Sequence, residues 1–178
     1  VISQSGETAD TLAALRLAKQ NGCKTFAITN VVGSSVSREA DFVFYTHAGP
    51  EIAVASTKAY ITQLIALYIF ALYMAQNRNY VEESVIENIK SELLSLPKKV
   101  KKALETDDIT KKIAQKICGE TDIFYLGRAL DYAVAMEGSL KLKEISYIHS
   151  EPYAGGELKH GPIALIEKGT VVIALNTN

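Results

Sequence analysis

Hydroxyl and amide side chains gather near the start of the chain, in the segment SQSGET at residues 3–8. This segment lies between a predicted strand end and a predicted helix start, where free backbone N–H groups and the positive end of the helix dipole meet. A phosphate bound there needs no lysine or arginine. Helix capping is the competing interpretation, and Glu7 and Asp10 must face away if a phosphate binds. The candidate phosphate ligands are Ser3, Gln4, Ser5 and Thr8.

A second group of polar side chains falls on one face of a predicted helix. Glu137, Lys141 and Glu144 are four and three residues apart, so they are neighbours on that face. An exposed ladder of ion pairs is one interpretation. The flanking residues are apolar on nearly every side, however, which favours a largely buried helix. A carboxylate held beside a lysine in such a place is a candidate general base for moving a proton between adjacent carbons of an open-chain sugar.

Glycines bracket a third polar pair, Lys159 and His160, in the segment GGELKHGP at residues 155–162. A histidine titrates near neutral pH and suits sugar ring opening, in which a proton moves between a hydroxyl and the ring oxygen. An ordinary surface loop is the competing interpretation. His47 and His149 have no comparable setting, and we expect them to be structural.

The elements that must position these groups alternate between strand and helix in the first part of the chain. This rhythm is typical of a parallel α/β sheet with helices on its faces. Ser56 or Thr57 could cap the last of these helices, or could offer a hydroxyl to a ligand. The pattern predicts a strand ending at residue 3, helices at 8–21, 33–40 and 57–76, and strands at 24–31 and 41–46.

The middle of the chain is polar and helical in period, and the α/β rhythm then restarts. We expect Pro97 to split the middle into two helices, and the basic run at 98–102 to be a solvated helix face. The pattern then predicts strands at 122–126 and 170–175 and a helix at 131–147. These observations divide the chain into an α/β domain at 1–78, a helical connector at 79–119 and a second α/β domain at 120–178.

Composition excludes several classes of protein. The 178 residues carry a net charge of −1, which leaves no electrostatic footprint for nucleic acid or an anionic membrane. The longest apolar run, at 64–75, falls short of the roughly 20 residues of a membrane span, so we expect a buried helix or a subunit interface. The two cysteines and three histidines lack the spacing of a disulfide scaffold or a metal site, which fits a reducing cytoplasm and no metal or cofactor.

Four motifs give the chain a specific family resemblance. SQSGET at 3–8, EIAVASTKA at 51–59, EGSLKLKEISY at 137–147 and GELKHGP at 156–162 resemble, in order and spacing, the isomerase region of glutamine–fructose-6-phosphate aminotransferases, the glucosamine-6-phosphate synthase family. The resemblance covers nearly the whole chain. It implies two sugar-isomerase (SIS) domains with a flavodoxin-like or Rossmann-like three-layer architecture. The SQSGxT loop alone would indicate only a SIS domain.

The resemblance also implies a role for each matching residue. Glu144 matches the base that shuttles a proton between C1 and C2, and Glu137 and Lys141 match its charged neighbours. His160 matches a ring-opening histidine that reaches the site of a partner subunit, so a homodimer is implied. The remaining matches are Ser3, Gln4, Ser5 and Thr8 to the phosphate loop, and Val54 and Ser56 to the sugar pocket.

The family converts fructose 6-phosphate and glutamine to glucosamine 6-phosphate and glutamate. On this resemblance we expect these residues to include no counterpart of the glutaminase domain, the first strand of the first SIS domain, the latter part of the second or the C-terminal lysine. We therefore expect no ammonia production from glutamine and weak or no isomerase activity from these residues alone. Two alternatives remain: a fructosamine-phosphate deglycase, or a non-catalytic phosphosugar-sensing module that would need the phosphate loop but not Glu144 and His160.

Overall fold

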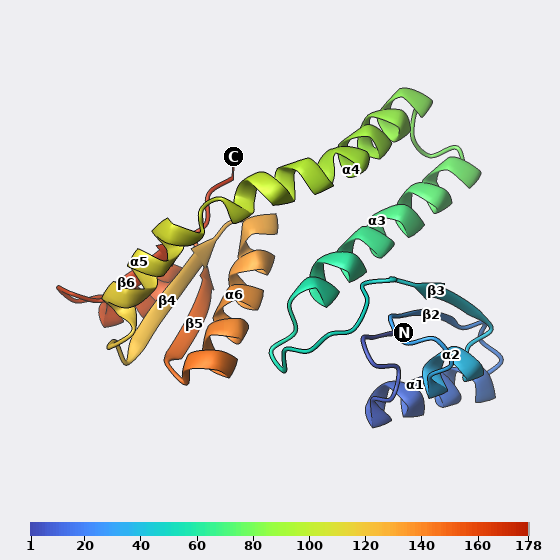
Figure 1. The fold of residues 1–178 in the computed structure, drawn as a ribbon, viewed down its shortest axis with the longest axis horizontal. Helices are drawn as coiled ribbons and strands as arrows, with labels where there is room; N and C mark the ends of the chain where they lie inside the picture. The colour runs from blue at the N-terminus through green and yellow to red at the C-terminus, as the bar shows by residue number, and fades with distance from the viewer. Residues whose placement is uncertain (178) are drawn as a thin grey trace. The chain divides into compact units, whose positions relative to one another are not determined.

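The computed structural model describes residues 1–177, which form two compact units divided between Lys99 and Val100. Each unit contains a three-stranded, wholly parallel sheet, which confirms the predicted α/β class (Figure 1). The first unit contains β1 (Ile2–Ser3), α1 (Ala9–Gln20), β2 (Phe26–Thr29), α2 (Ser35–Glu39), β3 (Phe42–Tyr45) and α3 (Lys58–Asn77). Helix α4 (Glu83–Leu104) crosses the division. The second unit contains α5 (Asp107–Ile117), β4 (Asp122–Gly127), α6 (Leu130–Ser146), β5 (His149–Ala154), the 3₁₀ turns η1 (Leu158–His160) and η2 (Pro162–Leu165), and β6 (Val171–Ala174).

The sheet of the first unit, in the order β1-β2-β3, lies between two layers of helix. Successive residues of a strand point to opposite faces, and β2 uses both. Ala27 packs in the fully apolar cluster formed with Leu12, Leu15 and Val36 of α1 and α2. Its neighbour Phe26 stacks on Phe70 of α3, with ring centroids 4.7 Å apart. The apolar run of β2 is therefore explained by burial on both sides.

Helix α3 is less buried than the sequence predicts. Of its twenty residues only Ala59 and Ala66 are buried, while Tyr68 and Tyr73 are 51% and 62% exposed. Within the described chain the prediction of a buried helix is wrong, because only one side of α3 meets the sheet. The alternative, a subunit interface, stays a prediction. The helix is long and apolar enough to cross a membrane by length and composition, a weak criterion that core helices of soluble proteins also meet.

Pro97 does not split the middle of the chain, as the sequence predicts, but lies inside α4. A proline within a helix removes one hydrogen bond and crowds the carbonyl four residues earlier, here that of Leu93. Helix α4 is mostly exposed, so water can satisfy that carbonyl and the remaining turns can continue. The break comes instead after Leu104, before α5 begins at Asp107.

Strand β5 has no counterpart among the predicted elements. Its sequence, HSEPYA, is polar and contains Pro152, which cannot donate to a neighbouring strand. The sheet of the second unit has the order β5-β4-β6, so β5 lies at an edge where a proline is tolerated. Its pairing with β4 runs from His149 opposite Asp122 to Ala154 opposite Gly127.

Helix α6 lies close to β4 and β5 because four small residues line the contact. We call these residues, Gly127, Gly138, Ser139 and Ser150, the small-residue seam. A side chain at Gly127 would lie 2.4 Å from the backbone of Asp131, and one at Gly138 would lie 3.0 Å from the Tyr125 ring. The hydroxyls of Ser139 and Ser150, both buried, each donate to the backbone carbonyl of the other residue at 3.1 and 2.9 Å.

Candidate functional site

The loops that follow β1, β2 and β3 gather at the carboxyl edge of the first sheet, where ligands bind in open α/β folds. Asn30, just after β2, joins the other two loops. Its backbone N–H donates to the carbonyl of Gln4 at 3.1 Å. Its side-chain oxygen accepts from the Ala48 N–H at 2.8 Å, and its amide nitrogen donates to the Gly49 carbonyl at 2.7 Å. One residue, through its backbone N–H and its side chain, therefore fixes the predicted phosphate loop relative to the segment leading to Val54 and Ser56.

The predicted phosphate loop, residues 3–8, is held by its own hydroxyls. Ser3 is only 6% exposed, and its Oγ accepts from the Gly6 N–H at 3.0 Å and lies 3.0 Å from Thr8 Oγ1. Gly6 has a φ of +68°, and a side chain there would come within 2.1 Å of Ser34 Oγ. The turn therefore requires glycine twice, once for its backbone conformation and once for lack of space.

Glu7, the acidic residue inside this loop, is directed to a partner. Its carboxylate accepts from the Ser35 N–H, at the start of α2, at 2.8 Å. That hydrogen bond lowers the pKa of the Glu7 carboxyl. Thr8 precedes α1 with an extended backbone, and its side chain makes no capping bond. The Glu7 carboxylate is therefore held by the start of α2. The hydroxyls of Ser5 and Thr8 remain exposed beside the first turn of α1.

The predicted capping of α3 by Ser56 or Thr57 is corrected by the structure. Thr57 is the N-cap residue, but its own side chain makes no capping bond. The acceptor is Glu51, whose carboxylate accepts from the Thr57 N–H at 2.9 Å. The sequence pattern alone assigns no role to Glu51. The only signal was an acid shortly before an apolar helix, which occurs in many sequences. Val54 is fully exposed and Ser56 half-buried.

In the second unit α6 brings Glu137, Lys141 and Glu144 together. The Lys141 ammonium lies 2.6 Å from Glu144 Oε2 and 3.7 Å from Glu137 Oε1. The prediction of a largely buried helix is wrong, because α6 covers a single face of the sheet and buries only Asp131, Ala135 and Ser139. The Glu144 side chain is 40% exposed. The ion pairs are therefore present, and the carboxylate that carries the predicted proton transfer remains accessible to a ligand.

His160 stands apart from that helix face in the described chain. It ends η1, its side chain is exposed, and its backbone N–H donates to the Glu157 carbonyl at 3.0 Å. Gly161 follows with a φ of +134°, a conformation that L side chains rarely adopt. Within residues 1–177 no hydrogen bond or ion pair links His160 to Glu137, Lys141 or Glu144. Its predicted service to a partner's site stays a prediction.

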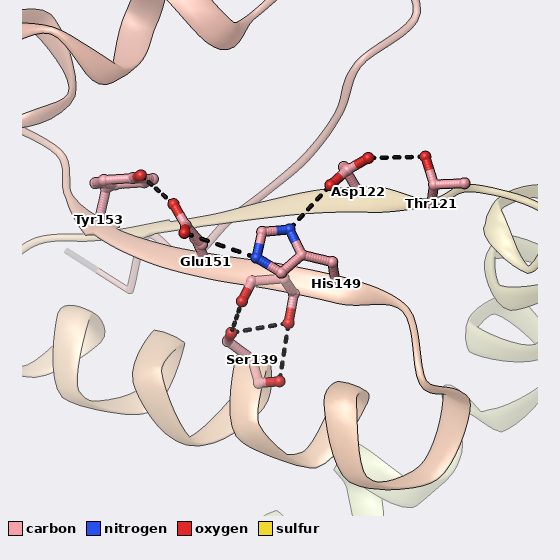
Figure 2. A network of polar contacts seen from close by, with 7 residues as sticks. Thr121, Asp122, Ser139, His149, Glu151 and Tyr153 are labelled. Atoms are coloured by element: carbon pink, nitrogen blue, oxygen red, sulfur yellow. Dashed lines mark hydrogen bonds and ion pairs between the residues drawn. The ribbon is translucent and has the colours of Figure 1, made fainter.

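His149 belongs to a polar network at the other end of the second sheet (Figure 2). Its Nδ1 lies 2.9 Å from Asp122 Oδ1 and its Nε2 lies 3.7 Å from Glu151, which accepts from the Tyr153 hydroxyl. Hydrogen bonds from the Thr121 hydroxyl and then from His149 lower the pKa of Asp122. Asp122 and His149 are paired at the amino ends of β4 and β5, so their contact fastens the two strands there, while Glu151 and Tyr153 extend the network along β5.

Comparison with known families and proteins agrees with this arrangement. The model of the SIS domain matches residues 1–73 and 116–178. Glutamine–fructose-6-phosphate aminotransferase from Clostridium tetani is 68% identical over 177 residues, which are 99% of this chain and 29% of the relative. The chain thus spans less than a third of the length of the curated relatives that it matches.

Two solved structures show the same fold. The C-terminal domain of glucosamine-fructose-6-phosphate aminotransferase from Francisella tularensis superimposes with a TM-score of 0.94 at 48% identity, over 97% of this chain and 49% of that one. Glucosamine-6-phosphate deaminase from Thermotoga maritima superimposes with a TM-score of 0.75 at 27% identity, over 97% and 50% of the two chains.

Proposed function

This chain belongs to the SIS domain family, and we propose that it forms the isomerase part of an enzyme that converts fructose 6-phosphate, with ammonia released from glutamine, to glucosamine 6-phosphate. The names and identities of its relatives support this assignment, and so does the C-terminal domain of the Francisella tularensis protein. The reaction needs one group that holds the phosphate and another that moves a proton between C1 and C2.

The observation that carries the proposal is the arrangement of polar groups in the predicted phosphate loop. Its hydroxyls and N–H groups surround the start of α1, and Glu7 is engaged by the Ser35 N–H. That bond directs the carboxylate, which stays charged, toward the start of α2 and so limits its repulsion of a phosphate dianion. We assign phosphate binding to Ser3, Gln4, Ser5 and Thr8, and sugar contacts to Val54 and Ser56.

Proton transfer falls to α6 and to the loop after β5. Glu144 would remove the proton from C1 of the imine formed between ammonia and the open-chain ketose, and deliver it to C2. Lys141, 2.6 Å away, holds the carboxylate in place, and Glu137 holds the ammonium from its other side. His160 would move a proton between a sugar hydroxyl and the ring oxygen as the ring opens.

A product assay on the protein as its gene encodes it tests the proposal. We expect glucosamine 6-phosphate from fructose 6-phosphate when either glutamine or ammonia is supplied, detected by chromatography of the amino sugar. Replacing Thr8 by valine removes one hydroxyl and should raise the KM for fructose 6-phosphate more than it lowers kcat. No amino sugar phosphate under either nitrogen source would contradict the proposal.

A second candidate is an enzyme that breaks a bond between a sugar phosphate and an amine. The similarity to glucosamine-6-phosphate deaminase favours it, because the same carboxylate could move a proton in the opposite direction. Fructosamine phosphates and glucosamine 6-phosphate therefore belong in the same substrate panel. Faster cleavage of any of them than formation of glucosamine 6-phosphate would select this candidate.

We further propose a cytoplasmic homodimer in which His160 serves the site of the partner subunit. The exposed, unpaired cysteines Cys23 and Cys118 and the exposed apolar side of α3 support this proposal. Light scattering should give twice the mass of one subunit, and His160→Ala mixed with an active-site variant of the other subunit should recover activity. A monomer of full activity would contradict the dimer.

A further inference from the structure

A single carboxylate closes the loop between β3 and α3. Glu51 Oε2 accepts from the Thr57 N–H at 2.9 Å and from the Ala59 N–H at 3.3 Å, while Oε1 accepts from the Thr57 hydroxyl at 3.1 Å. Two of the free N–H groups at the start of α3 are thus satisfied by a residue six and eight positions upstream in the sequence. The N–H of Thr57 accordingly holds the pKa of the Glu51 carboxyl below its usual range. The loop's two ends are joined by this side chain.

The residues between these ends do not hold themselves in place. Ile52 and Val54 are 92% and 105% exposed, so no apolar packing anchors them. Ser56 has a φ of +53°, which is unfavourable for a residue with a side chain. One internal hydrogen bond, from the Ser56 N–H to the Ala53 carbonyl at 3.1 Å, completes the turn. A strained and unpacked backbone keeps one conformation only when its surroundings impose it, and here Glu51 supplies that constraint.

We propose that Glu51 is a positioning residue for the sugar: by capturing the N–H groups of Thr57 and Ala59 it fixes the loop that presents Val54 and Ser56 to the substrate. This inference rests on the proposed function, since it assumes that those two residues contact the sugar. Glu51 is not assigned any contact with the substrate itself. Its carboxylate is fully engaged by α3 and by the Thr57 hydroxyl.

A purely structural role would look different in an experiment. If Glu51 only capped α3, its removal would lower the melting temperature and leave the affinity for the sugar unchanged. If it positions the loop, the loss appears in the KM for fructose 6-phosphate, because the loop must then be ordered on binding. The KM for the nitrogen source should not move, since no part of this loop is proposed to bind ammonia or glutamine.

Three substitutions at one position separate these outcomes. Glu51→Gln keeps an oxygen that can accept from both N–H groups, so it should raise the KM for fructose 6-phosphate less than about threefold. Glu51→Ala removes every acceptor and should raise that KM about 10- to 100-fold, a loss of one to two hydrogen bonds plus loop ordering. Glu51→Asp keeps the negative charge near α3 but is one methylene shorter, so it should bind the sugar like Glu51→Ala while melting close to wild type.

The assay uses the protein as its gene encodes it, with Glu82→Ala, an exposed acid between α3 and α4, as the matched control. An unchanged KM for fructose 6-phosphate in Glu51→Ala and Glu51→Asp would overturn the inference, whatever happens to melting. Equal KM increases in the Gln and Ala variants would also overturn it, because capture of the N–H groups would then be irrelevant. An inactive wild type would instead count against the proposed function, and the two failures are therefore distinguishable.

Discussion

The predicted phosphate loop and the charged face of α6 differ in the kind of polar group they carry and in how far those groups are exposed. In the loop, uncharged hydroxyls and N–H groups bond to one another, and Ser3 and Gly6 are buried. On α6, a lysine lies between two carboxylates, and Glu144 is 40% exposed. Fixed dipoles suit a group that must be held without reacting. An accessible carboxylate suits a proton that must leave and return. Binding and chemistry should therefore fail separately when each region is changed.

The largest effect should come from Glu144→Gln. Removing the proposed base should lower kcat by about 100- to 10,000-fold, the usual contribution of a general base. The KM for fructose 6-phosphate and the melting temperature should stay near wild type, because the glutamine keeps the size of the side chain and an exposed ion pair adds little stability. Steady-state kinetics and thermal melts measure both, with Glu120→Gln as a control on an exposed acid. A raised KM with normal kcat would reverse the assignment of the two regions.

Gly6→Ala should break the loop rather than the chemistry. The new side chain would meet Ser34 at 2.1 Å and would force a φ of +68° on alanine, so we expect a loss of about 2–4 kcal/mol in the free energy of unfolding. Gly33→Ala is the matched control. It has a φ of +76° but nothing within 4 Å, and should cost only about 1 kcal/mol. Urea titration compares them, and equal losses would show that space around Gly6 is not limiting.

Ser139→Val tests the small-residue seam beneath the charged face. Ser139 is fully buried, and valine would both overfill its place and lose the bond to the Ser150 carbonyl, at a cost of about 1–3 kcal/mol. Ala133→Val, on the exposed side of α6, carries the same β-branched side chain and should cost about 0.7 kcal/mol or less. Urea midpoints of the two variants should differ clearly. Similar midpoints would mean that the seam has room to spare.

The smallest expected effect is the dependence of stability on pH in the first unit. The Thr25 N–H and hydroxyl both donate to Asp41 at 2.8 Å and lower its pKa in the folded state below the ordinary value of 3.8. The folded protein then binds fewer protons than the unfolded chain, so this contribution is present above the ordinary pKa and is lost as pH falls through the lowered one. Between pH 5 and 3 the urea midpoint should fall less steeply in Asp41→Asn than in wild type.

High salt separates the cause of that shift. Hydrogen bonds from Thr25 contribute more to it than the neighbouring lysines do, so the difference between the two slopes should survive in about 1 M salt, where charges act over only about 3 Å. A difference that disappears in salt would assign the shift to Lys19 and Lys24 instead.

The sequence predicted those elements whose apolar residues recur with the period of a helix or form a short apolar run typical of a strand. The predicted strands around Ala27 and Ile123 and the helix around Leu15 are present within a few residues of their expected ends. Strand β5 was not predicted, because its pairing with β4 comes from the neighbouring strand and not from its own polar sequence. The rule that proline ends a helix fails at Pro97, because the helical turns on both sides of it continue α4.

The candidate site divides in the same way. The motifs around Ser3 and Glu144 could be identified from residue type and spacing, since neighbours on a loop or helix face are close in sequence. The partner of Glu7 is 28 residues away in sequence. Asn30 bonds to Gln4 on its amino-terminal side and to Gly49 on its carboxyl-terminal side. Contacts of that kind depend on the arrangement of the sheet, which no short window of sequence contains. The exposure of Glu144 likewise depends on which side of α6 meets the sheet.

The small-residue seam couples the position of Glu144 to the packing of α6 on the sheet. A Cβ atom at Gly138 would lie only 3.0 Å from the Tyr125 ring, and Glu144 follows Gly138 by nearly two turns of the same helix. Because a helix is rigid, a small tilt at Gly138 shifts the end of the helix as well. A single added methyl group at position 138 would therefore displace Glu144 without touching it, and under the proposed function a displacement of about 1 Å is enough to slow the reaction about a hundredfold.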